Sequence, residues 1–84
     1  MTIRDFIISE FPDQELLFAD GFDNAVIGVD HASQRLIYSI DLCMEILVQE
    51  GMTMEDALEH LEFNVINAYV GEKTPIWCQD INWL

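Results

Sequence analysis

Basic residues are scarce in this sequence. Its 84 residues include three Lys and Arg against sixteen Asp and Glu, which gives a formal net charge of −13 at pH 7. Proteins that bind DNA, RNA or an anionic membrane surface use Lys and Arg to neutralise phosphates. Because Arg4, Arg35 and Lys73 are scattered along the chain, we expect no direct binding to nucleic acid or to a membrane.

Long hydrophobic runs and cysteine motifs are also missing. No apolar run reaches the roughly 18 residues that span a bilayer, and no basic segment with a long apolar run opens the chain. We therefore expect a cytoplasmic protein. Cys43 and Cys78 form no metal motif and should be reduced, largely buried thiols. Neither Ser33 nor Ser39 has the Gly-x-Ser-x-Gly setting of a nucleophile, so we expect a non-enzymatic protein without a cofactor.

Apolar residues, by contrast, make up 51% of the chain, enough for one modest core. The sequence predicts one α+β domain over residues 1–84, with elements in the order α-β-β-α-α-β. A hairpin and one later strand would form a three-stranded, mainly antiparallel sheet with the helices packed on one face.

The first half of the chain carries clear start and stop signals. Residues 2–11 are predicted to form a helix that Thr2 and Asp5 cap reciprocally. Residues 16–19 fit either a short edge strand or an extended lead-in. Residues 25–30 and 35–40 have the alternation and β-branched content of a hairpin, and Gly28 within the first strand indicates a bulge or a close backbone approach.

The second half is predicted to contain two helices and a strand. A helix over residues 41–49, capped by Ser39 or Asp41, is apolar on most sides and is expected to be the central core helix. A second helix, which Thr53 should open with a variant capping box, should run from Thr53 to about residue 70, and a strand should follow at residues 75–78. The expected core face of the second helix consists of Met54, Ala57, Leu58, Leu61, Val65 and Ala68.

The acidic side chains of the second helix are the leading candidate for a functional surface. Glu55, Glu59 and Glu62 recur at helical spacing with Asp56 beside them, and carboxylates in such a row can imitate a line of phosphates. Asp20 and Asp23 form a second candidate patch. The alternative is an ordinary solvated helix face, although solvated faces usually mix charges of both signs.

Two other clusters have structural explanations as well as functional ones. Asp20, Asp23 and Asp30, with His31 nearby, could hold Ca²⁺ or Mg²⁺, but their spacing departs from known motifs and fits turn chemistry. His60, Asn64 and Asn67 share one helical stripe. Because asparagine is unfavourable inside helices, we expect these side chains to make structural hydrogen bonds.

Four segments carry a family resemblance: residues 19–28 (ADGFDNAVIG), 37–39 (IYS), 62–65 (EFNV) and 68–76 (AYVGEKTPI). In these segments the chain resembles a family of small, acidic, uncharacterised proteins of tailed bacteriophages. The resemblance implies a phage accessory protein in the bacterial host cytoplasm and supplies no catalytic residue.

Together with the acidic charge, this resemblance leads us to expect an inhibitor or modulator of a host protein with a basic surface, such as a nucleic-acid-handling or defence enzyme. The alternative is a small assembly protein that forms a homodimer through Trp77, Trp83 and Leu84.

Overall fold

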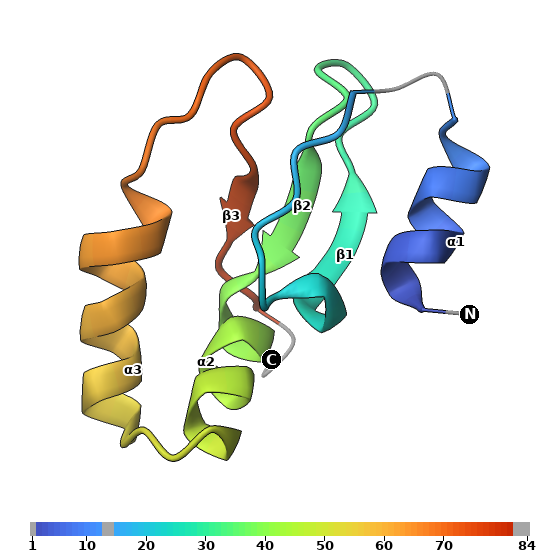
Figure 1. Ribbon diagram of the computed structural model, residues 1–84. Helices are drawn as coiled ribbons and strands as arrows, with labels where there is room; N and C mark the ends of the chain where they lie inside the picture. Colours follow the sequence, from blue (N-terminus) through green and yellow to red (C-terminus); the bar gives the residue numbers. More distant parts are fainter. Residues whose placement is uncertain (1, 13–14, 82–84) are drawn as a thin grey trace.

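The computed structural model describes residues 2–12 and 15–81, and Figure 1 shows the arrangement of the chain. The elements are α1 (Ile3–Glu10), the 3-10 helix η1 (Asp23–Ala25), β1 (Val26–Val29), β2 (Leu36–Ser39), α2 (Ile40–Gln49), α3 (Met54–Leu61), the π-helical segment η2 (Glu62–Ile66) and β3 (Ile76–Cys78). The predicted α+β class and element order are confirmed. Residues 16–19 form the extended lead-in, and no strand is assigned to them.

The sheet has the strand order β1-β2-β3. Strands β1 and β2 are antiparallel, and their register shifts between Val26 and Gly28, so the expected bulge is present. Strand β3 pairs with β2 in parallel, with Tyr38 opposite Trp77. The sheet is therefore mixed rather than mainly antiparallel. The parallel pair arises because the chain leaves the end of β2 through α2 and α3 and returns to the start of β2 by a long loop.

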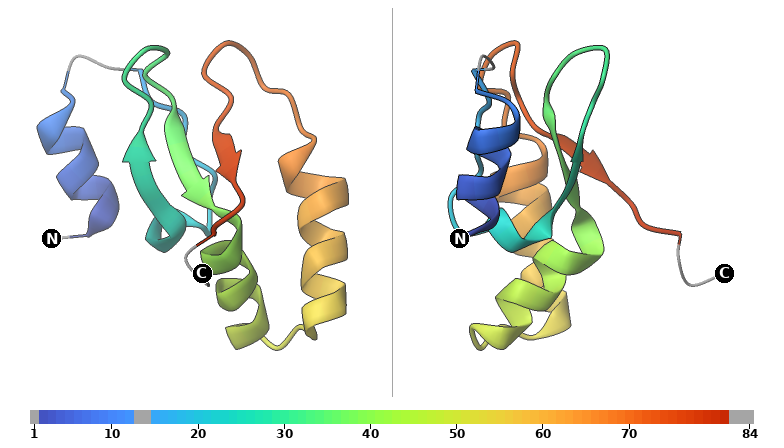
Figure 2. Two further views of the ribbon diagram at one scale, coloured as in Figure 1. Left: turned by 180° about the vertical axis from the view of Figure 1, so that it is seen from behind. Right: turned by 90° about the vertical axis from the view of Figure 1, so that its right-hand side faces the viewer.

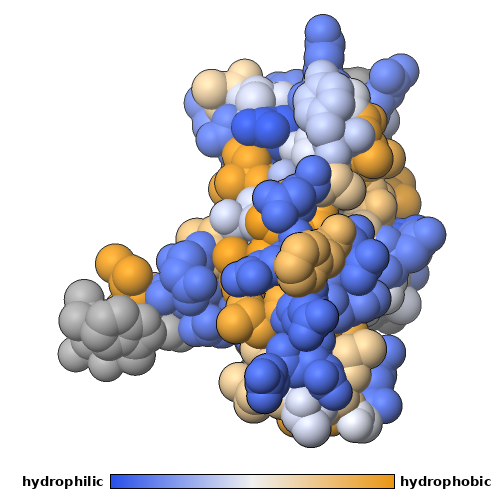
Figure 3. All heavy atoms as spheres, turned by 90° about the vertical axis from the view of Figure 1, so that its left-hand side faces the viewer, coloured by the Kyte–Doolittle hydropathy of each residue, from blue (hydrophilic) through white to orange (hydrophobic). Residues whose placement is uncertain are grey.

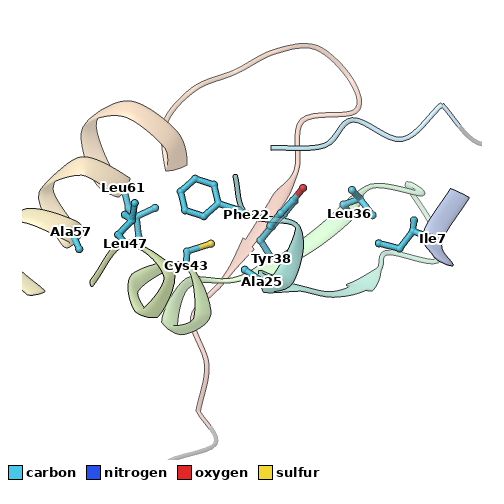
Figure 4. Close-up of a cluster of buried hydrophobic side chains, with 9 residues drawn as sticks. All are labelled: Ile7, Phe22, Ala25, Leu36, Tyr38, Cys43, Leu47, Ala57 and Leu61. Carbon is cyan, nitrogen blue, oxygen red and sulfur yellow. The ribbon is translucent and has the colours of Figure 1, made fainter. Parts of the chain in front are cut away.

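The buried core lies where the sheet meets the helices (Figure 4). It consists of Ile7, Phe22, Ala25, Leu36, Tyr38, Cys43, Leu47, Ala57 and Leu61. Tyr38 is fully buried, and its hydroxyl oxygen accepts a 2.7 Å hydrogen bond from the Ala19 backbone N–H. Its ring centroid lies 4.9 Å from that of Trp77. Tyr38 thus ties the lead-in segment, β2 and β3 together.

Helix starts follow the predicted capping. Thr2 and Asp5 form the reciprocal capping box of α1. The Ser39 hydroxyl accepts from the Leu42 N–H at the start of α2, and Thr53 accepts from the Asp56 N–H at the start of α3. In the edge-on view of Figure 2, α1 and α3 lie on the same side of the sheet, and α2 continues from the end of β2.

Helix α2 contributes to the core as predicted, but the prediction that it is buried on most sides was wrong. Only Cys43 and Leu47 of this helix are buried, because α2 extends beyond the ends of the strands instead of crossing a face of the sheet (Figure 1). Helix α3 covers one of its sides. The remaining apolar side chains of α2 are left in partly open positions.

The second predicted helix is shorter than expected and turns a narrower face to the core. Helical structure ends at Ile66, where the Asn67 side chain donates to the Glu62 carbonyl oxygen at 2.6 Å. Ala57 and Leu61 are buried, whereas Met54 and Leu58 are 63% and 44% exposed, and Ala68 is exposed beyond the helix end. The core face was predicted too wide because apolar residues on one flank of α3 face a groove instead.

Candidate interaction surface

The acidic ridge on α3 consists of Glu55, Asp56, Glu59 and Glu62, and all four residues are exposed. Thr53 caps the helix start, and Glu55 and Asp56 lie in its first turn, where the helix dipole favours negative charge. Glu59 follows one turn later, and Glu62 begins η2. Within the described residues, no carboxylate of the ridge takes part in an ion pair. Figure 3 shows hydrophilic residues along the outward face of α3, with hydrophobic residues beside and between them.

The basic side chains lie away from this ridge. Arg35 donates from Nη1 to the Thr74 carbonyl oxygen at 3.1 Å, and Lys73 donates from Nζ to the Ser33 carbonyl oxygen at 3.2 Å. Both contacts join the β1–β2 loop to the loop before β3, at the end of the molecule opposite the α2–α3 turn (Figure 1). These cations therefore fasten two loops together and do not neutralise the ridge.

The second predicted patch faces a cation of its own chain. Arg4 donates from Nε to Asp23 at 2.9 Å and from Nη2 to Asp20 at 3.2 Å. The hydrogen bonds to Asp23 and then Asp20 raise the pKa of the Arg4 guanidinium, which also stacks 4.4 Å above the Phe18 ring centroid. Asp20 and Asp23 thus hold α1 against η1, and Arg4 offsets part of the negative charge that they would offer a partner.

Sequence reasoning overlooked the surface beside the ridge. A groove runs between α2 and α3, with a volume of about 450 Å³. The α2–α3 groove is lined by the apolar residues Ile40, Met44, Val48, Met54 and Leu58. Asp41 and Glu45 also line it, both from α2. The sequence signal for this groove was the four-residue spacing of apolar residues on each helix, but those residues were predicted to lie in the core.

The hairpin aspartates do not converge. Asp30 accepts from the Ser33 N–H at 2.8 Å and from the Ser33 hydroxyl at 2.6 Å, and these two bonds lower the pKa of its carboxyl group. Asp20 and Asp23 face Arg4 instead. Among the described residues, no group of three or more His, Cys, Asp or Glu is placed to hold a metal ion.

The polar stripe on α3 and η2 makes local hydrogen bonds, as predicted. The Asn64 amide lies 3.5 Å from His60 Nδ1, and Asn67 bonds the Glu62 carbonyl oxygen. The stripe therefore shapes the end of the helix.

Both cysteines are free, as expected. Cys43 is fully buried and Cys78 is partly buried. Burial and then the charge of Asp80 raise the pKa of the Cys43 thiol from 9.0 to about 12. The thiol of Cys43 thus stays protonated in the core and behaves as a small apolar side chain.

A second concave site, with a volume of about 310 Å³, lies between the lead-in segment, η2 and β3. Phe18, Phe22, Val65 and Trp77 supply much of its apolar wall, and Asp20 is the one titratable residue among the described residues that line it. Among these described residues, no pair of groups is brought together for acid–base or nucleophilic chemistry. Trp77 packs against Tyr38, whereas Trp83 and Leu84 lie outside the described residues.

Comparison with known proteins gives no identification. No protein family, curated protein or solved structure matches this chain. Within the described residues, the helices are too short or too polar to cross a bilayer.

Proposed function

We propose that the protein is a non-enzymatic binding protein that docks on a basic surface of another protein and inhibits or modulates it. The observation that carries this proposal is the acidic ridge, whose four exposed carboxylates lack ion-pair partners among the described residues. Like charges at helical spacing destabilise a helix by a few tenths of a kcal/mol per pair. An opposing cationic surface would relieve this repulsion and gain new ion pairs.

The charge of the ridge also indicates the kind of target. Carboxylates about 5–6 Å apart on a helix face can take the place of a row of phosphates in a basic channel. The expected partner is therefore a nucleic-acid-handling protein of a bacterial host, including a restriction or CRISPR effector. The phage-family resemblance agrees with such a role in the host cytoplasm. Electrostatic steering would raise the association rate, with a strong dependence on salt.

The test compares two variants of equal net charge. Glu55→Lys/Glu59→Lys reverses the ridge, whereas Glu10→Lys/Glu15→Lys reverses two exposed acids outside it. Each tagged variant is expressed in the bacterial host, and proteins that co-purify are identified at about 50 and about 300 mM salt. We expect a basic nucleic-acid-binding partner to be retained by the parent and control, lost from the ridge variant, and released at high salt. Equal capture of that partner by both variants would refute the proposal for the ridge.

Self-association is the second candidate function. The observation that favours it is the exposure of large apolar residues outside the core, including Ile81 at 66%. Sedimentation velocity over a concentration series distinguishes the two functions. A monomer at all concentrations argues against assembly, and a salt-insensitive dimer argues that the acidic surface serves solubility.

A further inference from the structure

The apolar lining of the α2–α3 groove is an ordered feature of both helices. On α2, Ile40, Met44 and Val48 recur every four residues and so lie along one side. On α3, Met54 and Leu58 do the same. The two helices are joined by a short turn and run in opposite directions (Figure 1), so the two apolar rows face each other across the groove.

The α3 side of the groove is open to solvent, whereas Ile40 and Met44 on the α2 side are half-buried and pack against the core. Val48 is 36% exposed, in addition to the more exposed Met54 and Leu58. The core is filled instead by Cys43 and Leu47 from α2 and by Ala57 and Leu61 from α3. The groove is therefore an apolar surface that the fold leaves partly uncovered, mainly at Met54 and Leu58. A groove of this form accepts the apolar face of an amphipathic helix, and methionine side chains adapt readily to different partners.

Charge determines which kind of helix would fit. Asp41 and Glu45 line the groove from α2, opposite Met54 and Leu58 of α3. Residues 40–66 contain seven Asp and Glu and no Lys or Arg. A second copy of this chain would bring the same acids to the groove and be repelled, whereas a helix with Lys or Arg beside its apolar stripe would find ion-pair partners in Asp41 and Glu45.

We propose that the α2–α3 groove binds a cationic amphipathic helix of the partner protein, with its apolar stripe on Met44, Met54 and Leu58 and its Lys or Arg residues facing Asp41 and Glu45. The proposal rests on the proposed function, because it specifies the partner element that the acidic surface recognises. Helix α2 has 10 residues and is about 15 Å long, so three turns of the partner helix would cover the groove. Gln79, which donates to Asp41 at 3.2 Å, lines the groove beside that residue.

The test uses a defined probe. The probe is a synthetic peptide of about 15 residues, built from leucine and lysine with leucines at helical spacing. Its control is a scrambled peptide of identical composition without helical periodicity. Binding is measured by titration calorimetry, and the site is located from the ¹³C-labelled methionine methyl signals of the protein. Met52 serves as an internal control because it lines a different concave surface, with His60 and Phe63.

We expect the amphipathic peptide to bind with one-to-one stoichiometry, to become helical, and to shift the Met44 and Met54 signals more than that of Met52. The Leu58→Gln variant should weaken binding about tenfold, which matches the loss of about 1.4 kcal/mol of apolar contact. Phe63→Gln, which changes a 75% exposed residue outside the groove, should leave the affinity within about twofold of the parent. Both substitutions change exposed side chains, so both variants should fold.

Three results would overturn the groove proposal. Equal affinity for the amphipathic and scrambled peptides would mean that charge alone attracts them. An unchanged affinity of Leu58→Gln would place the peptide elsewhere. Shifts of Met44 and Met54 that depend on protein concentration without peptide would identify a second copy as the occupant. None of these results refutes ridge-dependent binding of a basic host protein, because Glu55→Lys/Glu59→Lys tests that function separately.

Discussion

Ser39 joins the sheet, α2 and the segment after β3 through one hydroxyl group, so its removal is the sharpest test of the fold. The side chain is fully buried. Its Oγ accepts from the Leu42 N–H at 3.1 Å and donates to the Asp80 carboxylate, whose two oxygens both lie 2.7 Å away. Ser39→Ala would break both contacts at once without changing the course of the backbone.

The expected loss follows from these two bonds. Removing a helix N-cap costs about 1 kcal/mol. A hydrogen bond to a charged group contributes about 1.5–3 kcal/mol. The substitution costs less than this full value, because Asp80 keeps a further interaction. Together these terms give a loss of about 2–3 kcal/mol in the free energy of unfolding. For a domain of this size, the loss lowers Tm by roughly 10–20 °C.

Thr53→Ala is the matched control, because Thr53 caps α3 by one bond at an exposed position. It should cost about 1 kcal/mol and lower Tm by about 4–8 °C. Urea denaturation followed by circular dichroism measures the free energy of unfolding of both variants. An Asp80→Asn background should reduce the effect of Ser39→Ala if the two side chains interact. If Ser39→Ala costs no more than Thr53→Ala, the part-buried hydrogen bond between Ser39 and Asp80 adds nothing to stability beyond the cap.

Four further predictions address the core and the charge. In the native protein at pH 8, the thiol reagent DTNB should react with Cys78 and reach Cys43 only after unfolding; fast modification of Cys43 in a Cys78→Ser variant would contradict its burial. Folding raises the pKa of the Cys43 thiol from 9.0 to about 12, so the contribution of the protonated thiol to stability is complete below about pH 9 and is lost as pH rises towards 12. The Cys43→Ala variant should therefore show a smaller pH dependence of stability over that range. Tyr38→Phe should cost about 1–2 kcal/mol by removing the acceptor of the Ala19 N–H, whereas Tyr69→Phe, at a 78% exposed position, should cost almost nothing in the same denaturation assay. Finally, Tm should rise with added salt from low ionic strength, because screening weakens repulsion among the acids, and a Tm that does not change with salt would show that this repulsion is unimportant.

Local signals in the sequence predicted the local structure well. Thr2, Ser39 and Thr53 cap helices as their positions indicated, and the bulge lies beside Gly28. Each of these features depends on a few neighbouring residues, so the sequence contains all that is needed to recognise it.

The candidate site was harder to predict because its parts come from separate segments. An apolar row at four-residue spacing has the same pattern in a core as in a groove, so Met54 and Leu58 were assigned to the wrong environment. The pairing of Arg4 with Asp20 and Asp23 joins residues 16 and 19 positions apart, and no local pattern indicates it. The acidic ridge was found correctly as a helix stripe, but its position beside an apolar groove depends on how α2 and α3 pack.

The separation of charge along the molecule gives it an electrical polarity. The α2–α3 hairpin holds acids without Lys or Arg, whereas Arg35 and Lys73 fasten the loops at the opposite end. A positively charged surface will therefore orient the protein before contact, so that the α2–α3 hairpin faces that surface. On an anion-exchange resin, two variants of identical net charge should elute apart, with the ridge-reversed protein leaving first. The protein's retention on the resin is then set by which face carries the charge as well as by its total.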